Sequence, residues 1–324
     1  MSNNIKNVLL VGTGMMAIEY VKVLKGMGEN YQVVGNSKKS VDNFMDITGV
    51  NAHSGGIEQY VKAEEWKKQV PQSAIVAVNG NKLYEVTKLL IEAGVKKILV
   101  EKPGGILLEE IQELISTVDK NGTRVFVAYN RRFYSSVKKA KEIIQEDGGI
   151  TSLNFEFTEW KHVVEKTSHP DEIKQKWFLM NSSHVVDLAF YLGGQPEEIT
   201  VYKAGGLTWH KAGSVFTGCG ITQKGILFNY QANWDAPGRW GIEILTQKHR
   251  LYLKPLEKLQ IQKIGSVAVE EYNIDDSLDC EYKAGLFQEV NAFLNEDIET
   301  AELCTLQEQA ENLRIYQKIS GEKY

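Results

Sequence analysis

The chain has 324 residues, 43% of them hydrophobic and 24% charged, which is enough for one large domain or two. Its formal net charge of −5 offers no basic field to phosphate backbones, so we expect no nucleic-acid partner. No apolar run reaches the ~18 residues that span a bilayer, and the N-terminus lacks a signal-peptide pattern. We therefore expect a cytoplasmic protein with no membrane partner.

Metal and disulfide chemistry find little support in the sequence. Cys219, Cys280 and Cys304 are far apart and form no CxxC pair, so we interpret them as reduced, inert thiols. The six histidines are scattered, with no HxxxH-type pair. We predict no metal site.

The first 130 residues alternate short apolar runs with segments of helical periodicity. Strands are expected within 7–14, 31–37, 73–80, 96–103 and 123–130, and helices within 15–28, 83–94 and 109–122. This alternation, with nearly continuous apolar strands, predicts a parallel sheet covered by helices on both faces.

After about Asn130 the pattern changes to alternating apolar and polar residues. Strands are expected within 152–160, 197–206, 215–234, 240–255 and 258–265, and helices at 182–194, 281–296 and 305–319. Gly193 and Gly194 are the stop signal of the first of these helices. The pattern predicts an antiparallel sheet with one covered face, and the change near residue 125 predicts two domains, 1–124 and 125–324.

A glycine turn follows the first strand in VLLVGTGMMA, which matches GxGxxA at Gly12, Gly14 and Ala17. Gly12 would make the tight turn, Gly14 would let a pyrophosphate approach the backbone, and Ala17 would let helix and strand pack closely. The turn leaves a strand and opens a helix, which is the context that dinucleotide binding requires. The alternative is a purely structural turn.

The end of the second strand bears on the choice of cofactor. NAD sites usually place Asp or Glu there, whereas VVGNSKKS has Asn36, followed by Ser37, Lys38 and Lys39. The missing carboxylate removes repulsion of a 2′-phosphate, and the hydroxyl and lysines provide possible ligands. We expect NADP(H) to be preferred, with NAD(H) possible if Asn36 holds the ribose.

The glycine turn, VEKPGG, YNRRF and SSHVVDLAFYLGG occur in that order, and together they resemble the glucose–fructose oxidoreductase, inositol dehydrogenase and rhizopine-catabolism family (Gfo/Idh/MocA). The resemblance implies a Rossmann domain followed by an α+β domain with an open, mostly antiparallel sheet. It also implies sugars, cyclitols or nucleotide-linked sugars as substrates. Family members commonly associate through the outer face of that sheet, which implies a homodimer or homotetramer.

Individual residues carry over from the resemblance. Lys102 matches a lysine that contacts cofactor and substrate hydroxyl, and Pro103 matches a proline whose peptide bond is often cis. His184 matches a histidine proposed as acid/base, and Asp187, one turn later on the same helix face, would support the helix or the site. The residues that we assign to cofactor binding are Gly12, Thr13, Gly14, Met15, Met16, Asn36, Ser37, Lys38, Asn79, Glu101 and Lys102.

The sequence departs from the family pattern in two places. Relatives often carry an aspartate four residues before the histidine, where this chain has Met180, and Asn181 or Ser183 would be partial substitutes. The loop after the third strand usually has a TPNxxH-like pattern, where this chain has NGNKLY, with Tyr84 near the expected histidine. Both departures concern the proton relay.

Substrate contacts are expected from Arg131, Trp160, Asp187 and Arg239, because aromatic rings stack on sugars or bases and arginines clamp phosphate. The alternative is that these aromatic clusters only pack a sheet and its edge. The leading prediction is an NAD(P)-dependent oxidoreductase for a sugar or nucleotide-linked sugar, as in surface-polysaccharide pathways. Two alternatives are an NAD-dependent inositol dehydrogenase and a non-catalytic dinucleotide sensor.

Overall fold

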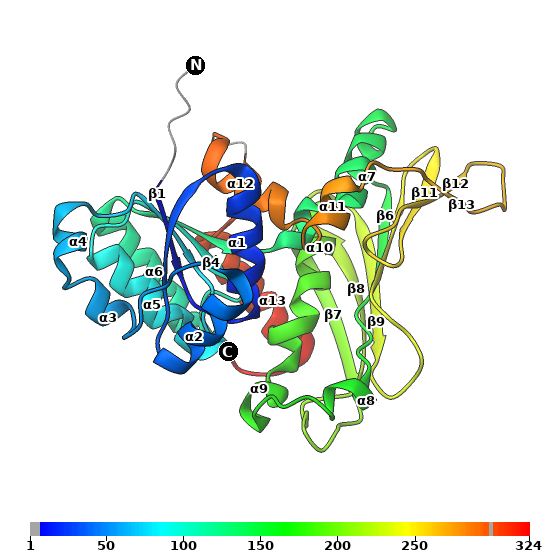
Figure 1. Ribbon diagram of the computed structural model, residues 1–324. Coiled ribbons are helices and arrows are strands. Elements are labelled where there is room, and N and C mark those ends of the chain that lie inside the picture. The colour runs from blue at the N-terminus through cyan, green and yellow to red at the C-terminus, as the bar shows by residue number, and fades with distance from the viewer. Residues whose placement is uncertain (1–6, 298–300) are drawn as a thin grey trace. The chain divides into compact units, whose positions relative to one another are not determined.

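The computed structural model of the chain describes residues 7–297 and 301–324, which form two compact units (Figure 1). The first unit comprises the residues up to Tyr129 together with Glu281–Glu311. The second comprises Asn130–Cys280 and Asn312–Tyr324. Each unit is built around its own sheet.

The sheet of the first unit has six strands in the order β14-β5-β4-β3-β1-β2. These strands are β1 (Asn7–Val11), β2 (Asn30–Val34), β3 (Ser73–Val76), β4 (Lys97–Glu101), β5 (Arg124–Ala128) and β14 (Cys304–Thr305). The first five pair in parallel, and β14 adds an antiparallel edge to β5. β3 is buried along its whole length, as the continuous apolar run in the sequence predicted.

The helices of the first unit are α1 (Met15–Met27), α2 (Lys38–Thr48), α3 (Ile57–Tyr60), α4 (Glu64–Lys68), the 3₁₀ turn η1 (Gly80–Lys82), α5 (Leu83–Glu92), α6 (Leu108–Asn121) and α12 (Leu286–Asn295). α1 packs against α2 and α12, and α5 packs against α6. Figure 1 shows the sheet between the α1–α12 pair and the α5–α6 pair. Strand order reverses direction at β1–β3, so right-handed crossovers place these helices on opposite faces, as predicted.

The sheet of the second unit has eight strands in the order β13-β12-β11-β10-β6-β9-β8-β7. They are β6 (Ser152–Glu156), β7 (Pro196–Ala204), β8 (Val215–Thr222), β9 (Leu227–Asn233), β10 (Gly241–Leu245), β11 (His249–Leu253), β12 (Gln260–Lys263) and β13 (Glu270–Glu271). Neighbours are antiparallel except β6 and β9, which are parallel. The predicted mostly antiparallel sheet is confirmed, and β9 alternates buried and exposed residues along its length.

The helical segments of the second unit are the 3₁₀ turn η2 (Asn130–Phe133), α7 (Ser135–Glu146), α8 (Lys161–Val164), α9 (Asp171–Gln175), the π-helical turn η3 (Phe178–Ser182) and α10 (Ser183–Gly193). α11 (Ser277–Glu281) and α13 (Leu306–Ser320) cross the division between the units. α10 packs on β6 and β10, and Gly194 ends it with a φ of 91°, which confirms the predicted stop. Almost every residue of α10 is buried, so its polar side chains must find partners inside the unit.

The division between the units differs in detail from the predicted domains 1–124 and 125–324. Residue 124 opens β5, whose register with β4 keeps it in the first sheet, and the division follows Tyr129. Residues 281–311 return to the first unit, which the sequence did not suggest. Across 7–297 and 301–324, no helix combines the length and apolar character needed to cross a membrane.

Candidate functional site

The glycine turn between β1 and α1 is shaped by a close backbone approach. Gly12 has a φ of +129°, and its N–H donates to Val34 O at 2.8 Å. A Cβ at Gly12 would lie 2.1 Å from Ala77 O, so no side chain fits there. The turn is therefore fixed by the neighbouring strands β2 and β3.

The N-terminus of α1 is open to an anion. Gly14 caps the helix without any side-chain hydrogen bond, and a Cβ at Gly14 would meet nothing within 4 Å. Ala17 is fully buried, which brings helix and strand close together. Free N–H groups, a favourable helix dipole and open space at Gly14 fit the pyrophosphate of a dinucleotide.

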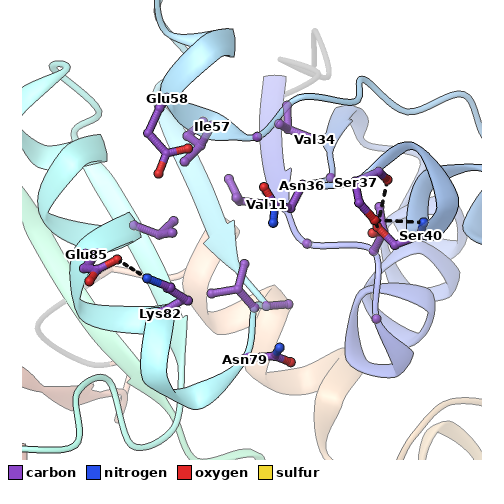
Figure 2. Close-up of a pocket in the computed structure, with 18 residues that line it drawn as sticks. Val11, Val34, Asn36, Ser37, Ser40, Ile57, Glu58, Asn79, Lys82 and Glu85 are labelled. Carbon is purple, nitrogen blue, oxygen red and sulfur yellow. Dashed lines mark hydrogen bonds and ion pairs between the residues drawn. The ribbon is translucent and has the colours of Figure 1, made fainter.

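This end of the sheet borders a pocket of about 600 Å³ (Figure 2). Its walls come from the ends of β1, β2 and β3 and from the segments that follow them. Six of the predicted cofactor residues line it: Gly12, Thr13, Gly14, Asn36, Ser37 and Asn79. This position, beyond the carboxyl ends of parallel strands where their order reverses, is where open α/β sheets bind ligands.

The remaining predicted cofactor residues, Met15, Met16, Lys38, Glu101 and Lys102, lie outside the pocket lining. Met15 is 76% exposed, and Lys38 pairs with Asp42 at 2.8 Å on the surface of α2. Prediction from sequence missed the wall residues Ser40, Gly56, Ile57, Glu58, Lys82, Glu85 and Val86. The sequence signal for this wall was the Gly-Gly pair at 55–56, which indicates a turn; both glycines have positive φ.

Two polar walls face each other in Figure 2, where Ser37 and Ser40 lie on one side and Glu58, Lys82 and Glu85 on the other. Ser37 caps α2, accepting a hydrogen bond from Ser40 N at 3.2 Å. Glu58 Oε2 and Asn36 Oδ1 both lie within 3.2 Å of where a Cβ of Gly56 would be. The Glu58 carboxylate therefore lies close to Asn36. It comes from α3 and not from the end of β2, where NAD sites usually place their acid.

The VEKPGG segment leaves β4 at Glu101, whose side chain is partly buried. Tyr20 of α1 donates its hydroxyl to Glu101 Oε1 at 2.9 Å. Burial raises the pKa of Glu101, although the Tyr20 hydrogen bond and the nearby Lys102 and Lys283 act in the opposite direction. Glu101 thus fixes the end of β4 to α1.

Lys102 and Pro103 are held from a distant part of the chain. Gln309, near the start of α13, donates Nε2 to Pro103 O at 2.9 Å and accepts from the Tyr129 hydroxyl at 3.1 Å. The Lys102–Pro103 peptide bond is cis, as the family resemblance implied. Gln309 is fully buried, so the backbone that carries Lys102 is tied to the end of β5 and to α13.

In the second unit, His184 begins α10 next to a buried ion pair. Asp187, one turn later, receives Arg132 Nε at 2.8 Å and Arg132 Nη2 at 2.5 Å, and both side chains are almost completely buried. Asn312 of α13 donates to the same carboxylate at 3.2 Å. These bonds anchor α10, while the substrate contact expected of Asp187 stays a prediction.

A second buried carboxylate, Glu159, lies at the end of the segment after β6. Ser182 donates its hydroxyl to Glu159 Oε1 at 2.8 Å, and Asn181 donates Nδ2 to Oε2 at 3.0 Å. Trp240 Nε1 donates to Oε1 at 3.2 Å, and Arg239 pairs with Oε2 at 3.3 Å. Burial raises the pKa of Glu159 against the combined effect of these donors.

Trp240 joins the predicted residues of the second unit into one cluster. Its ring centroid lies 6.3 Å from that of His184, 4.8 Å from the Arg131 guanidinium and 4.3 Å from the Arg239 guanidinium. Arg239 also lies 4.9 Å from the ring of Trp160. Residues predicted separately at 131, 160, 184 and 239 thus gather around one indole, together with the unpredicted Glu159.

The two departures from the family pattern have structural counterparts. Beside Met180, Asn181 and Ser182 bind Glu159, so a carboxylate lies close to the start of α10 although position 180 lacks one. Ser183, the other proposed substitute, donates to Leu179 O instead. The Tyr84 hydroxyl donates to Glu113 of α6 at 2.5 Å, and Tyr84 does not line the pocket.

Comparison with known proteins agrees with this geometry. Residues 6–129 match the family model described as "Oxidoreductase family, NAD-binding Rossmann fold" (GFO_IDH_MocA). The match identifies residues 6–129 as similar to the NAD-binding Rossmann domain of Gfo/Idh/MocA oxidoreductases. A 127-residue stretch is 27% identical to scyllo-inositol 2-dehydrogenase (NADP(+)) IolW of Bacillus subtilis, over 36% of this chain. The match spans only about a third of that relative (33%).

Solved structures share the fold of this chain over nearly its full length. A putative NADPH-dependent oxidoreductase from Desulfitobacterium hafniense aligns with a TM-score of 0.79 at 16% identity, covering 100% of this chain and 96% of that one. The WlbA dehydrogenase of Chromobacterium violaceum, solved with NADH and UDP-GlcNAcA, aligns at 0.72 and 17%, covering 97% and 92%. At these identities the likeness shows the fold alone.

Proposed function

We propose that this protein is an NAD(P)-dependent oxidoreductase that transfers hydride between nicotinamide and a secondary alcohol or ketone of a sugar or nucleotide-linked sugar. The main support is the pocket at the glycine turn, where Gly12 is seated against Ala77 and Gly14 opens on free helix N–H groups. The match of residues 6–129 to the model of an oxidoreductase family supports the reaction class. The nucleotide-linked sugar in the WlbA structure supports the substrate class.

Two side chains would carry the proton chemistry. The bound nicotinamide would supply or accept hydride. The Lys102 ammonium would donate to the reacting oxygen as negative charge develops there. His184, whose type of side chain titrates near neutral pH, would take up or return the hydroxyl proton. The ties from Gln309 and Glu101 would fix Lys102, and the Arg132–Asp187 pair would fix the helix of His184.

Replacing these two groups tests the mechanism. Lys102→Met should leave cofactor binding nearly intact and lower kcat by at least about 10²-fold, because a positioned acid/base contributes ~10²–10⁴-fold. His184→Gln should flatten the pH–rate profile near neutrality. Lys96→Met is a matched control, since Lys96 is exposed and only donates to Asn121 O at 3.2 Å. Unchanged turnover in Lys102→Met would remove Lys102 from the mechanism.

The activity itself is measured by absorbance of reduced nicotinamide during a screen of sugars, inositols and nucleotide-linked sugars. Turnover confined to inositols would favour the cyclitol alternative, which the name of the Bacillus subtilis relative supports. Cofactor binding with no turnover on any compound would favour a non-catalytic dinucleotide sensor. Met180 supports this alternative, because it stands where relatives often carry an aspartate.

For the cofactor we propose a preference for NADP(H). Asn36 stands where NAD sites usually have an acid. Ser37 and Ser40, at the N-terminus of α2, line the pocket beside it. Glu58 is the observation that favours NAD(H), because its carboxylate would repel a 2′-phosphate near Asn36. The ratio of kcat/KM for NADP(H) and NAD(H) measures the preference. Glu58→Gln should shift this ratio toward NADP(H) if Glu58 faces the ribose.

We also propose that copies of this chain associate through the outer face of the second sheet, as the family resemblance implies. The expected product is a homodimer or homotetramer in the cytoplasm. Exposed apolar side chains on that sheet support this proposal, since Tyr202 of β7 is 66% exposed and Leu227 of β9 is 62% exposed. Light scattering on the purified protein measures the oligomer, and Tyr202→Lys should dissociate it.

A further inference from the structure

Two guanidinium groups stack on one buried indole in the second unit. The Arg131 and Arg239 guanidinium carbons lie 4.8 Å and 4.3 Å from the Trp240 ring centroid, and Trp240 is only 6% exposed. Arg131 follows β5 in the turn η2, whereas Arg239 and Trp240 come from the loop before β10. The two positive charges repel each other, so a nearby anion would stabilise this arrangement.

Within the described residues, Arg239 has an ion pair but Arg131 has none, although Glu257 and Glu159 attract Arg131 electrostatically. Glu159 pairs with Arg239 at 3.3 Å, but no carboxylate of the described chain lies within ion-pair distance of Arg131. Arg131 has one side-chain hydrogen bond, a long one of 3.4 Å to Asn130 Oδ1. Burial is the largest cause that lowers the pKa of Arg131, and repulsion from Arg239 adds to it, against the opposing effects of Tyr134, Glu257 and Glu159.

The arginines also keep donors available. A guanidinium offers five N–H donors, and Arg239 uses one toward Glu159. The Arg239 side chain is 41% exposed, so a ligand has access to it. Trp160 lies 4.9 Å from the same guanidinium, and its own N–H is occupied by Gly238 O at 2.7 Å. The Arg239 guanidinium therefore lies against both indole rings, and its remaining N–H groups are available for hydrogen bonds.

We infer that Arg131 and Arg239 form an acid-recognition site, and that the substrate is a sugar carrying a carboxylate or phosphate group. This inference deepens the proposed function and rests on it for the role of His184. The His184 ring centroid lies 6.3 Å from that of Trp240, the indole on which both guanidinium groups lie. An acid held by the arginines would therefore lie near the proposed acid/base, which places the acidic group on the reacting sugar. Paired arginines match the bidentate geometry of either oxyanion.

Binding of small acids tests the site without any turnover. Glucuronate and glucose 6-phosphate are titrated against the purified full-length protein by calorimetry and thermal shift, with glucose as the neutral match. We expect at least one acid to bind and glucose to bind at least about tenfold more weakly, since loss of a charge-assisted contact costs about that factor. The stronger of the two acids identifies the group as carboxylate or phosphate.

Substitutions assign the binding to these two side chains. Arg239→Gln should weaken binding of the preferred acid at least about tenfold, Arg131→Gln should do the same, and Arg239→Lys should recover part of the loss. Arg250→Gln is the matched control, because Arg250 also lies over an aromatic ring, Tyr252 at 5.2 Å, and pairs with a carboxylate, Glu243. Because Arg239 is partly exposed, its variants should fold normally.

The possible outcomes separate this inference from the proposed function. Equal binding of glucose and the acids, no binding of either acid, or full binding by Arg239→Gln would each overturn the acid site. Acid binding without turnover on any acidic sugar would uphold the site and count against the oxidoreductase proposal. Turnover of neutral sugars with no acid binding would uphold the oxidoreductase proposal and overturn the acid site.

Discussion

The glycine-turn pocket of the first unit and the Trp240 cluster of the second are built in opposite ways. The pocket is lined by segments that follow the strands of one sheet, and its shape at the glycine turn depends on the absence of side chains at Gly12 and Gly14. The cluster is made of side chains that come from positions 131, 159, 184 and 239–240.

This difference affects how each region tolerates change. A backbone cradle is sensitive to any added atom but indifferent to most neighbouring side chains. A cluster of buried charges depends on every partner, because removing one leaves another unpaired and poorly solvated. The three predictions that follow test this contrast, from the largest expected effect to the smallest.

The largest effect is expected from the buried ion pair beneath the cluster. Arg132→Met removes both guanidinium hydrogen bonds from the buried Asp187 carboxylate, and should lower the free energy of unfolding by about 3–5 kcal/mol. Arg250→Met, at a more exposed pair, should cost about 1 kcal/mol or less. Urea unfolding of both variants gives the comparison, and similar losses would show that burial is not decisive here.

An intermediate effect is expected in the glycine turn. Gly12→Ala places a methyl group 2.1 Å from Ala77 O at a positive φ, which should cost about 1–3 kcal/mol in strain and abolish cofactor binding. Gly14→Ala meets no atom within 4 Å, so it should fold normally and weaken only cofactor binding. Unfolding curves and cofactor titrations measure both, and the contrast fails if the two variants lose equal stability.

The smallest effect is a change in the pH dependence of stability. Because burial raises the pKa of Glu159 above its ordinary 4.5, its favourable contribution is complete below 4.5 and is lost as pH rises through the raised value. Glu159→Gln should remove this decline, so the difference between variant and wild type should grow as pH rises from 4.5. Asp275, whose pKa is lowered by hydrogen bonds from Ser277, should show the opposite sign in Asp275→Asn.

The sequence predicted what depends on local pattern. The parallel and antiparallel sheets, the turn at Gly12 and the helix of His184 all follow from periodicity and glycine placement within short windows. Glu159 was not predicted, because its significance depends on Trp240, 81 positions away, and on the turn that brings Asn181 to it. The return of residues 281–311 to the first unit was also missed, since helix periodicity does not say which sheet a helix will cover.

The hydrogen bonds of Gln309 join early and late parts of the chain. The first 129 residues leave the ribosome early, yet the amide that holds Pro103 and Tyr129 is made about 180 residues later. A nascent chain with its early strands already paired could form the bond between Tyr20 and Glu101, but the Pro103 carbonyl would still lack the Gln309 donor. The backbone around Pro103 therefore gains this hydrogen bond only when synthesis is almost finished.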